Sequence, residues 1–220
     1  MEKIKLRHNL GLLAEAFQLN IVPECQDLND WLGFSFDLDS HEQKSIDYLH
    51  EQVKIDGKYW NEEELKIRFI GGLFAIANID TPNHLKVFYE RQLSAIINDQ
   101  TLNVVTDCLV ATPLKFNTPS KPYFFLQERY AARYKKGRGE AKDPEAQMLS
   151  AMLIAQYKNQ DEQPLYGSYV IGQNVYFSTL VGKDYCSSRQ FDATEKNDLL
   201  QIVFALRNLK NLVLKRKPLH

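Results

Sequence analysis

Three runs of β-forming residues decide the fold: KVFYERQLSAII (86–97), VVTDCLVA (104–111) and YFFLQERY (123–130). Apolar and polar residues alternate along them with the period of two that is typical of strands. The pair Asn98-Asp99 predicts a tight turn between the first run and the second. The stretch TPLKFNTPSKP (112–122), with its three prolines, is expected to separate the second run from the third. The block therefore predicts three consecutive antiparallel strands.

Helical patterns flank this block. Before it, WNEEELKIRFIGGLF (60–74) carries apolar residues at helical spacing, and Asn61 is a plausible N-cap because glutamates fill the following turn. Gly71-Gly72 within this pattern lowers helix propensity, which indicates a close approach of backbone to a neighbour. After the block, Asp143-Pro144 combines a good N-cap with a proline at the first helical position, and predicts a helix through residue 158.

Strand patterns return at LYGSYVIG (165–172) and VYFSTLV (175–181), and an apolar helical stripe runs through 194–215. The predicted order is therefore α, β-β-β, α, β(β), α, an α/β fold with a mixed sheet flanked by helices. Residues 1–59 are expected to form a helical segment, with two short helices, that packs on the core. Residues 60–220 are expected to form the main domain.

Composition excludes several classes of protein. The 220 residues include 27 Lys and Arg against 28 Asp and Glu, a net charge of −1 that provides no global attraction for nucleic acid or for anionic membranes. The three cysteines are widely spaced and form no Cys-x-x-Cys motif, which argues against a disulfide framework or a structural zinc site. No segment approaches the roughly 20 apolar residues of a membrane span. We therefore expect a cytoplasmic protein with no membrane partner.

Three carboxylates could meet in this architecture: Glu64 in the first core helix, Asp107 within the second strand, and Glu128 at the end of the third. If Thr112 pairs with Tyr123, Asp107 lies opposite Glu128 at about 5 Å. Opposed carboxylates destabilise a sheet, and Mg²⁺ or Mn²⁺ would offset the repulsion and coordinate phosphate oxygens. The alternative interpretation of each acid is structural, as a solvated side chain, a helix-dipole partner or a backbone hydrogen-bond acceptor.

One local stretch is basic, RYAARYKKGRGEAK (129–142). Arg133, Lys135, Lys136 and Arg138 could neutralise phosphates, while the interleaved tyrosines could stack on unpaired bases. Beside a metal site this patch would suit a nucleic-acid backbone. The alternative interpretation is a solvated loop.

The order of elements and the placement of the three acids resemble the PD-(D/E)XK nuclease superfamily, whose core is α-β-β-β-α-β. The resemblance covers 60–210, and within the superfamily it points to a subgroup of nuclease-like proteins through WNEEELKIRFIGGLF, TDCLVA, YFFLQE, DPEAQMLSAMLIAQ and PLYGSYVIG. It implies a restriction-endonuclease-like fold and metal-dependent hydrolysis of DNA, with Asp107, Glu128 and Glu64 at the metal. It also implies a site-facing role for Gln147, because some branches carry a glutamine on that helix.

The sequence departs from the superfamily pattern at one position. The residue two after the third-strand acid is usually lysine, and here it is Tyr130. A phenol donates a hydrogen bond but brings no positive charge to a developing anion. A lysine of the 135–142 loop could replace it. The alternative hypothesis is a catalytically inactive nuclease fold that binds nucleic acid or another protein, with a homodimer among the arrangements left open.

Overall fold

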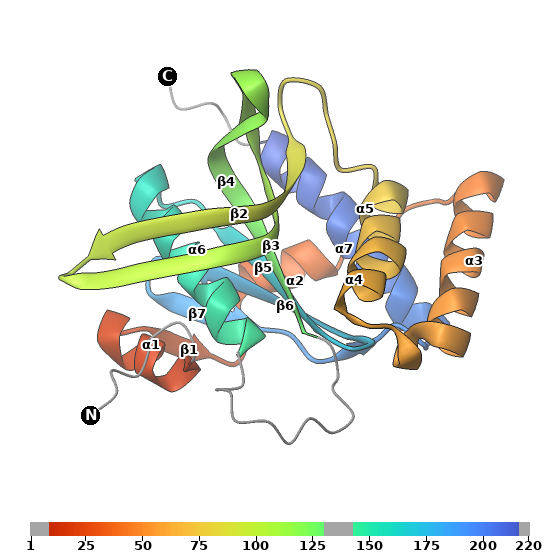
Figure 1. Ribbon diagram of the computed structural model, residues 1–220, viewed down its shortest axis with the longest axis horizontal. Helices are drawn as coiled ribbons and strands as arrows, with labels where there is room; N and C mark the ends of the chain where they lie inside the picture. Colours follow the sequence, from red (N-terminus) through yellow and green to blue (C-terminus); the bar gives the residue numbers. More distant parts are fainter. Residues whose placement is uncertain (1–8, 130–142, 216–220) are drawn as a thin grey trace.

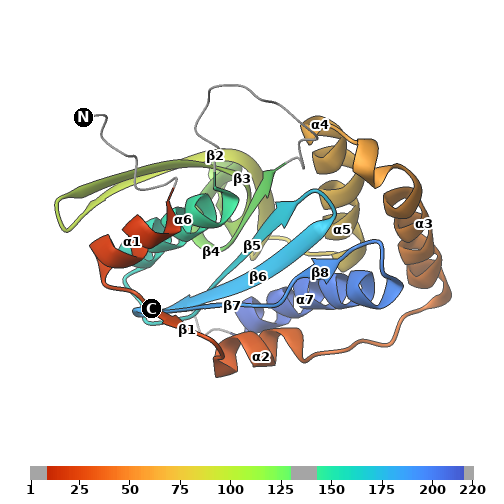
Figure 2. The same ribbon diagram turned by 90° about the horizontal axis from the view of Figure 1, so that it is seen from below.

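The computed structural model describes residues 9–129 and 143–215, with Glu128 and Arg129 described by their backbone alone. Eight strands form one mixed sheet with helices on both of its faces (Figures 1 and 2), which confirms the predicted α/β class. The strands are β1 (Asn20–Val22), β2 (Lys86–Ile97), β3 (Gln100–Leu114), β4 (Thr118–Arg129), β5 (Leu165–Ile171), β6 (Asn174–Val181), β7 (Asp184–Ser187) and β8 (Phe191–Asp192).

Seven α-helices and three shorter turns are assigned within the described residues. The helices are α1 (Leu10–Phe17), α2 (Gln26–Leu32), α3 (Ser40–Asp56), α4 (Glu62–Glu64), α5 (Gly71–Ala77), α6 (Pro144–Asn159) and α7 (Lys196–Leu214). A π-helical segment, η3 (Leu65–Ile70), joins α4 to α5, and the 3₁₀ turns are η2 (Gly57–Tyr59) and η4 (Lys115–Asn117). None of these helices combines the length and the apolar character that a membrane crossing requires.

The sheet has the order β1-β7-β6-β5-β4-β3-β2, with β8 paired to β6. Strands β2, β3 and β4 are antiparallel neighbours, as expected, whereas β4 and β5 run parallel. Helix α6 makes the crossover between these parallel strands and packs on both of them. The path from α4 to β5 therefore follows the order α, β-β-β, α, β.

Local sequence signals account for the element boundaries. Asn98 and Asp99 both adopt left-handed backbone, with φ of 49° and 62°, which is the geometry of a two-residue hairpin turn between β2 and β3. Asp143 caps α6 by accepting from the backbone of Glu145 and Ala146, with Pro144 at the first helical position, as predicted. Asn61 caps α4, also as predicted.

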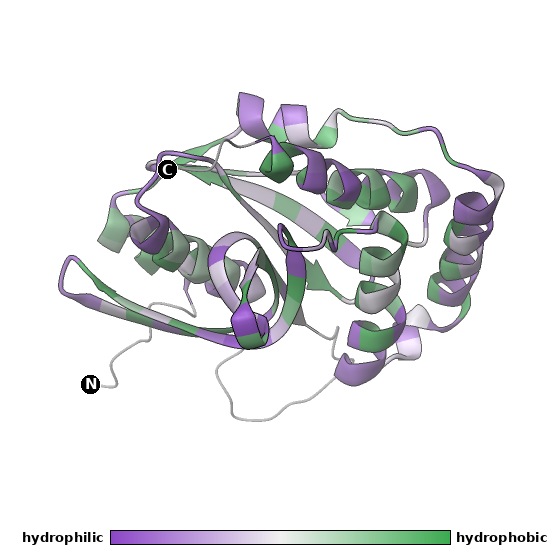
Figure 3. Ribbon diagram, turned by 90° about the horizontal axis from the view of Figure 1, so that it is seen from above, coloured by the Kyte–Doolittle hydropathy of each residue, from purple (hydrophilic) through white to green (hydrophobic). Residues whose placement is uncertain are grey.

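The sheet separates two hydrophobic cores. One face packs against α2, α3, α5 and α7, and the other against α1 and α6. Figure 3 shows hydrophobic residues along α6 and the central strands. Gly167 in β5 lies so close to α6 that an added Cβ would be 2.5 Å from the sulfur of Met148. Gly72 makes a similar approach, because an added Cβ would be 3.3 Å from Leu49 in α3, in agreement with the predicted close contact at this pair of glycines.

The first 59 residues contain more than the two expected helices. Their described part forms α1, α2 and α3, together with the three-residue strand β1, which adds parallel to β7 at one edge of the sheet. Trp31 of α2 is fully buried, and its indole nitrogen donates to the carbonyl of Ala205 in α7 at 2.7 Å. The division of the chain at residue 59 stays a prediction.

The connection between β3 and β4 lies within the proline-rich stretch 112–122, as expected, but both strands extend into this stretch and leave a connection of only three residues. Only η4 interrupts the strands, and pairing continues to Leu114 and Thr118. Pro113 lies opposite Pro119, beyond two register shifts between Val110 and Pro113, in a part of the ladder that accommodates residues lacking an N–H donor. The prolines therefore make the strand pairing of this hairpin irregular without ending its strands.

Candidate active site

A local irregularity in the β2–β3 ladder brings two acidic residues opposite each other. The two strands pair along their whole length except at Glu90 and Asp107, which lie opposite each other without pairing. Glu90 has left-handed backbone, with φ of 51°. Side-chain alternation reverses here, since Phe88 and Leu93, five residues apart, pack against the same core. A left-handed residue within a strand bends the strand and redirects its side chains, and non-glycine residues with such backbone cluster at functional sites.

The end of β4 lies close to this bend. Gln127 is buried, and its Nε2 donates to the carbonyl of Val105 at 2.9 Å, so β4 stays in contact with β3 just before Asp107. Glu128 follows directly and pairs through its backbone with Val170 of β5. The backbones of Asp107 and Glu128 are therefore neighbours on adjacent strands, and Asp107 itself is partly buried.

The register of this pair differs from the expected one. The sequence interpretation set Asp107 directly opposite Glu128, whereas the structure pairs Cys108 with Leu126, one residue out of step. The register departs further from the expected one beyond Val110, where shifts bring Ala111 opposite Pro122 and Leu114 opposite Thr118. Because side chains alternate along a strand, a slip of one residue changes which side chains share a face. The assumed opposition of these two acids is therefore incorrect.

Glu64 serves as a helix cap. Its Oε2 accepts from the backbone N–H of Asn61 at 2.9 Å, while Asn61 Oδ1 accepts from the backbone N–H of Glu64 at 2.9 Å. This reciprocal arrangement is a capping box and stabilises the first turn of α4. Glu64 therefore has a structural role as a helix-capping residue, and one of its carboxylate oxygens is engaged at the start of α4.

A lysine from η3 reaches the bend. Lys66 Nζ contacts Glu90 Oε1 at 2.5 Å, and the lysine side chain is only 16% exposed. The segment around it is π-helical, with the Gly71 N–H donating to the carbonyl of Lys66 five residues earlier. π-helical turns alter the direction of the side chains that they carry and occur frequently at functional sites. A cation therefore stands beside the two opposed acids.

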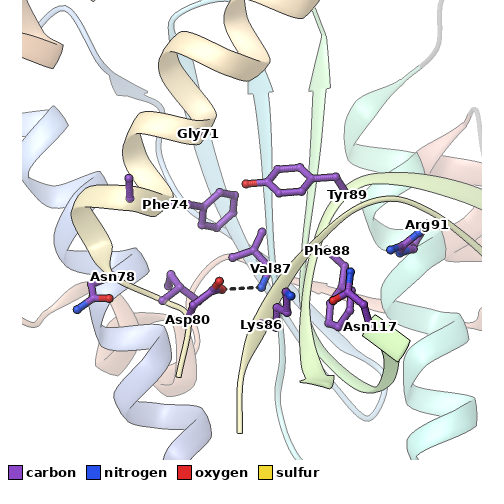
Figure 4. Close-up of a pocket in the computed structure, with 12 residues that line it drawn as sticks. Gly71, Phe74, Asn78, Asp80, Lys86, Val87, Phe88, Tyr89, Arg91 and Asn117 are labelled. Atoms are coloured by element: carbon purple, nitrogen blue, oxygen red, sulfur yellow. Dashed lines mark hydrogen bonds between the residues drawn. The ribbon is translucent and has the colours of Figure 1, made fainter. Parts of the chain in front are cut away.

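A cavity of about 520 Å³ opens between α5 and the edge strand β2 (Figure 4). Phe74 projects toward it from α5 and Tyr89 from β2. Burial, with smaller contributions from Cys108 and Asp80, raises the pKa of the Tyr89 phenol. The Asp80 carboxylate is engaged, because it accepts from the backbone N–H of Val87 at 2.8 Å.

Two cations line the same cavity. Lys86 stands near its Asp80 side, and Arg91 follows Glu90 in β2. The guanidinium carbon of Arg91 lies 5.7 Å from the centre of the Phe88 ring, and its buried Nε has no hydrogen-bond partner. Tyr89 and Arg91 flank Glu90 in sequence, so the cavity adjoins the bend. An anionic ligand in it would meet positive charge and an aromatic ring.

The remaining predicted site residues lie in α6 or outside the described residues. Gln147 is partly buried one turn into α6. The structure does not describe Tyr130 or the predicted nucleic-acid contacts of the loop, which are Arg133, Lys135, Lys136 and Arg138. Among the residues with described side chains, a set that leaves out Glu128, no group of three or more His, Cys, Asp or Glu could hold a metal ion.

Sequence reasoning missed a buried polar cluster beneath the start of α6. Tyr185 donates to Glu145 Oε1 at 2.8 Å, and the same hydroxyl lies 3.0 Å from Ser178 Oγ. Burial raises the pKa of Glu145, although hydrogen bonds from Tyr185 and Tyr169 oppose that shift. Tyr169 stacks on Tyr176 at 4.5 Å between ring centres. Only its position in the first turn of α6 distinguishes Glu145 in the sequence, and acidic residues at that position ordinarily interact with the helix dipole.

The sequence carries no clear signal that Lys66 and Glu90 contact each other. Both belong to regular patterns, a helix and a strand, in which charged residues are ordinarily solvated. The left-handed backbone at Glu90 and the π-helical turn at Lys66 are what bring them together.

No protein-family model matches the chain, and no curated protein matches it in sequence. Among solved structures, it is similar to a chain in the cryo-EM structure of a DrdV–DNA complex, with a TM-score of 0.39 and 13% sequence identity. The match covers 81% of this chain but only 14% of the matched chain. A similarity of this size carries no argument about function.

Proposed function

We propose that this protein is a metal-dependent phosphodiesterase of the PD-(D/E)XK type that acts on DNA. In this proposal Asp107 and Glu128 hold Mg²⁺ or Mn²⁺, and Glu64 contacts the metal through a water molecule. Mg²⁺ commonly takes one or two carboxylates and fills its remaining positions with water and substrate phosphate oxygens. In this proposal the irregularity at Asp107, where Val104 and Leu109 of β3 pack against the same core, turns its carboxylate toward the face that carries Glu128, and the two acids form a sufficient donor set.

The observation that carries the proposal is the bend at Glu90 and Asp107. A regular ladder would have used these positions for pairing, and like charges directly opposite each other destabilise a sheet. Here the pairing is interrupted, an aspartate in an otherwise apolar strand is partly buried, and the strand that ends in Glu128 lies alongside. A requirement for carboxylates at this point explains why the irregularity persists.

The order of elements supports the family within the proposal. Helix α4 with η3 and α5, then strands β2, β3 and β4, helix α6 and strand β5 follow the α-β-β-β-α-β order of the superfamily. Asp107 falls in the second of these strands and Glu128 at the end of the third, as the family pattern requires. The cavity beside the bend, with Lys86 and Arg91, offers a path for the phosphate backbone.

A second candidate function is an inactive nuclease fold that binds nucleic acid or another protein. Two contacts favour it: Glu64 is engaged in its capping box, and Glu90 is paired with Lys66. Acids that are already satisfied within the chain have less need of a metal. Tyr130 in place of the usual lysine points the same way.

The test is cleavage by the purified full chain of labelled single-stranded, duplex and branched DNA, with Mg²⁺, with Mn²⁺ and with EDTA. Cleavage is expected only with a metal. Asp107→Asn and Glu128→Gln should each lower the rate at least about 100-fold, because each removes a charge that holds the metal. Asp99→Asn is the matched control, since the same change is made at an exposed hairpin turn where Asn fits the left-handed backbone.

Absence of cleavage on every substrate in both metals would refute the nuclease proposal. If DNA binding then persists in EDTA and weakens steeply with salt, the binding function replaces it. Equal activity of Asp107→Asn and Asp99→Asn would remove Asp107 from the site even if the protein cleaves.

A further inference from the structure

We infer that Lys66 supplies the cation of this site, in the role that the superfamily gives to the lysine replaced here by Tyr130. The inference rests on the proposed function, because it names the group that acts beside the metal. Glu90 is then a positioning residue that holds the lysine in place.

The backbone of the preceding helix delivers this side chain. Lys66 lies in η3, directly after the capped turn of α4, and the π-helical hydrogen bond from Gly71 widens the turn that carries it. Its neighbours Leu65 and Phe69 are buried in the core, which fixes the segment against the sheet. The side chain is 16% exposed, in contrast to the exposed Arg68 on the same segment. Lys66 is therefore directed to the protein and Arg68 to the solvent.

The ion pair with Glu90 holds the Lys66 ammonium at the bend formed by Glu90 and Asp107. Nζ lies 2.5 Å from Glu90 Oε1, and Glu90 is the residue opposite Asp107. Opposite residues of an antiparallel ladder have Cα atoms only about 4.5 to 5.5 Å apart, so an ammonium at Glu90 also lies in the electrostatic field of Asp107. The positive charge offsets the repulsion between the two acids.

The chemistry assigned to this ammonium is electrostatic. In phosphodiester hydrolysis one water adds to phosphorus, one P–O ester bond breaks, and a proton from the water ends on the leaving oxygen. Lys66 stays protonated throughout and donates hydrogen bonds to the phosphate or the attacking water, stabilising the charge that develops. Glu90 holds the ammonium in position through the ion pair.

The deciding experiment compares Lys66→Gln, Lys66→Arg and Arg68→Gln in the full chain. Arg68→Gln is the matched control, as it removes one positive charge from the same segment but on its exposed side. Two quantities are measured: the maximal rate of DNA cleavage with Mn²⁺, and the affinity for Mn²⁺ alone, followed by the electron paramagnetic resonance signal of the free ion. Urea unfolding confirms that each variant is folded.

Lys66→Gln is expected to lower the maximal rate at least about 100-fold. It should also tighten Mn²⁺ binding about tenfold, because a competing positive charge leaves the carboxylates. Lys66→Arg should recover part of the rate, and Arg68→Gln should change neither quantity. Glu90→Gln, a second variant that leaves the lysine in place, should lower the rate by a smaller factor.

The outcomes separate the two proposals. If Asp107→Asn abolishes cleavage while Lys66→Gln cleaves like Arg68→Gln, the nuclease proposal stands and the role of Lys66 is overturned. If the unmodified protein cleaves nothing, the nuclease proposal fails, and the Mn²⁺ affinities then test whether Lys66 lies beside the metal. Equal affinities of Lys66→Gln and Arg68→Gln then overturn the placement of Lys66 beside the metal, whereas tighter binding by Lys66→Gln supports it.

Discussion

Replacement of Trp31 tests whether the N-terminal segment shares the core of the sheet. Its ring is fully buried in edge-to-face contact with Phe124, Tyr166 and Phe177, at 4.9 to 6.1 Å between ring centres. Truncation of a buried aromatic residue to alanine costs about 3 to 5 kcal/mol, and the lost hydrogen bond to Ala205 about 1 kcal/mol. We therefore expect Trp31→Ala to lower the free energy of unfolding by about 4 kcal/mol. The free energy of unfolding of a native protein is about 5 to 15 kcal/mol, so Trp31→Ala would remove a large fraction of it.

The measurement is urea unfolding followed by far-ultraviolet circular dichroism, because tryptophan fluorescence would change with the substitution itself. Trp31→Phe should lose only about 1 to 2 kcal/mol, since it keeps most of the ring contacts. Tyr48→Ala is the control: Tyr48 is an aromatic residue of α3, 66% exposed, and its loss should stay within about 0.5 kcal/mol. If Trp31→Ala and Tyr48→Ala unfold at the same urea concentration with the same slope, the reasoning is refuted.

Three further results are expected. Gly167→Ala should destabilise the fold by about 1 to 3 kcal/mol in the same urea assay, because its Cβ would meet Met148 at 2.5 Å; no loss would show that α6 shifts freely. Burial raises the pKa of Glu145 above its usual 4.5, so the folded chain binds that proton more tightly than the unfolded chain, and stability falls as pH rises from 4.5 through the folded pKa. Glu145→Gln should remove this decline, so the stability of the variant relative to the unmodified protein should be higher at pH 8 than at pH 4.5. An unchanged pH profile would contradict the raised pKa of Glu145. Burial also raises the pKa of Cys186 to about 12, so iodoacetamide at pH 8 should label it only after unfolding, as mass spectrometry would detect.

Much of the fold followed from periodicity and caps. The predicted strand 86–97 coincides with β2, and the helix predicted from Asp143-Pro144 coincides with α6. These signals are local, since a cap or a turn residue acts on its own few neighbours. β1 escaped prediction because three residues are too few to show a period, and it forms only by pairing with β7.

The arrangement of the site was less predictable than its elements. Asp107 and Glu128 could be assigned to adjacent strands from the sequence, but their register could not, because bulges near Pro113 shift it. Lys66 and Glu90 are 24 positions apart in the sequence, and their contact depends on the left-handed backbone at Glu90 and the π-helical turn at Lys66. Neither irregularity has a clear sequence signature, and both are determined by packing between the helix and the sheet.

The bend at Glu90 also has a consequence for solubility. β2 is an edge strand of the sheet, and a straight edge of 12 residues would present its unpaired N–H and C=O groups as a template for strands of other chains. The left-handed residue divides that edge into two shorter lengths that run in different directions. A substitution that straightens this strand would therefore endanger the protein through fibril formation and precipitation, even where folding and chemistry survive.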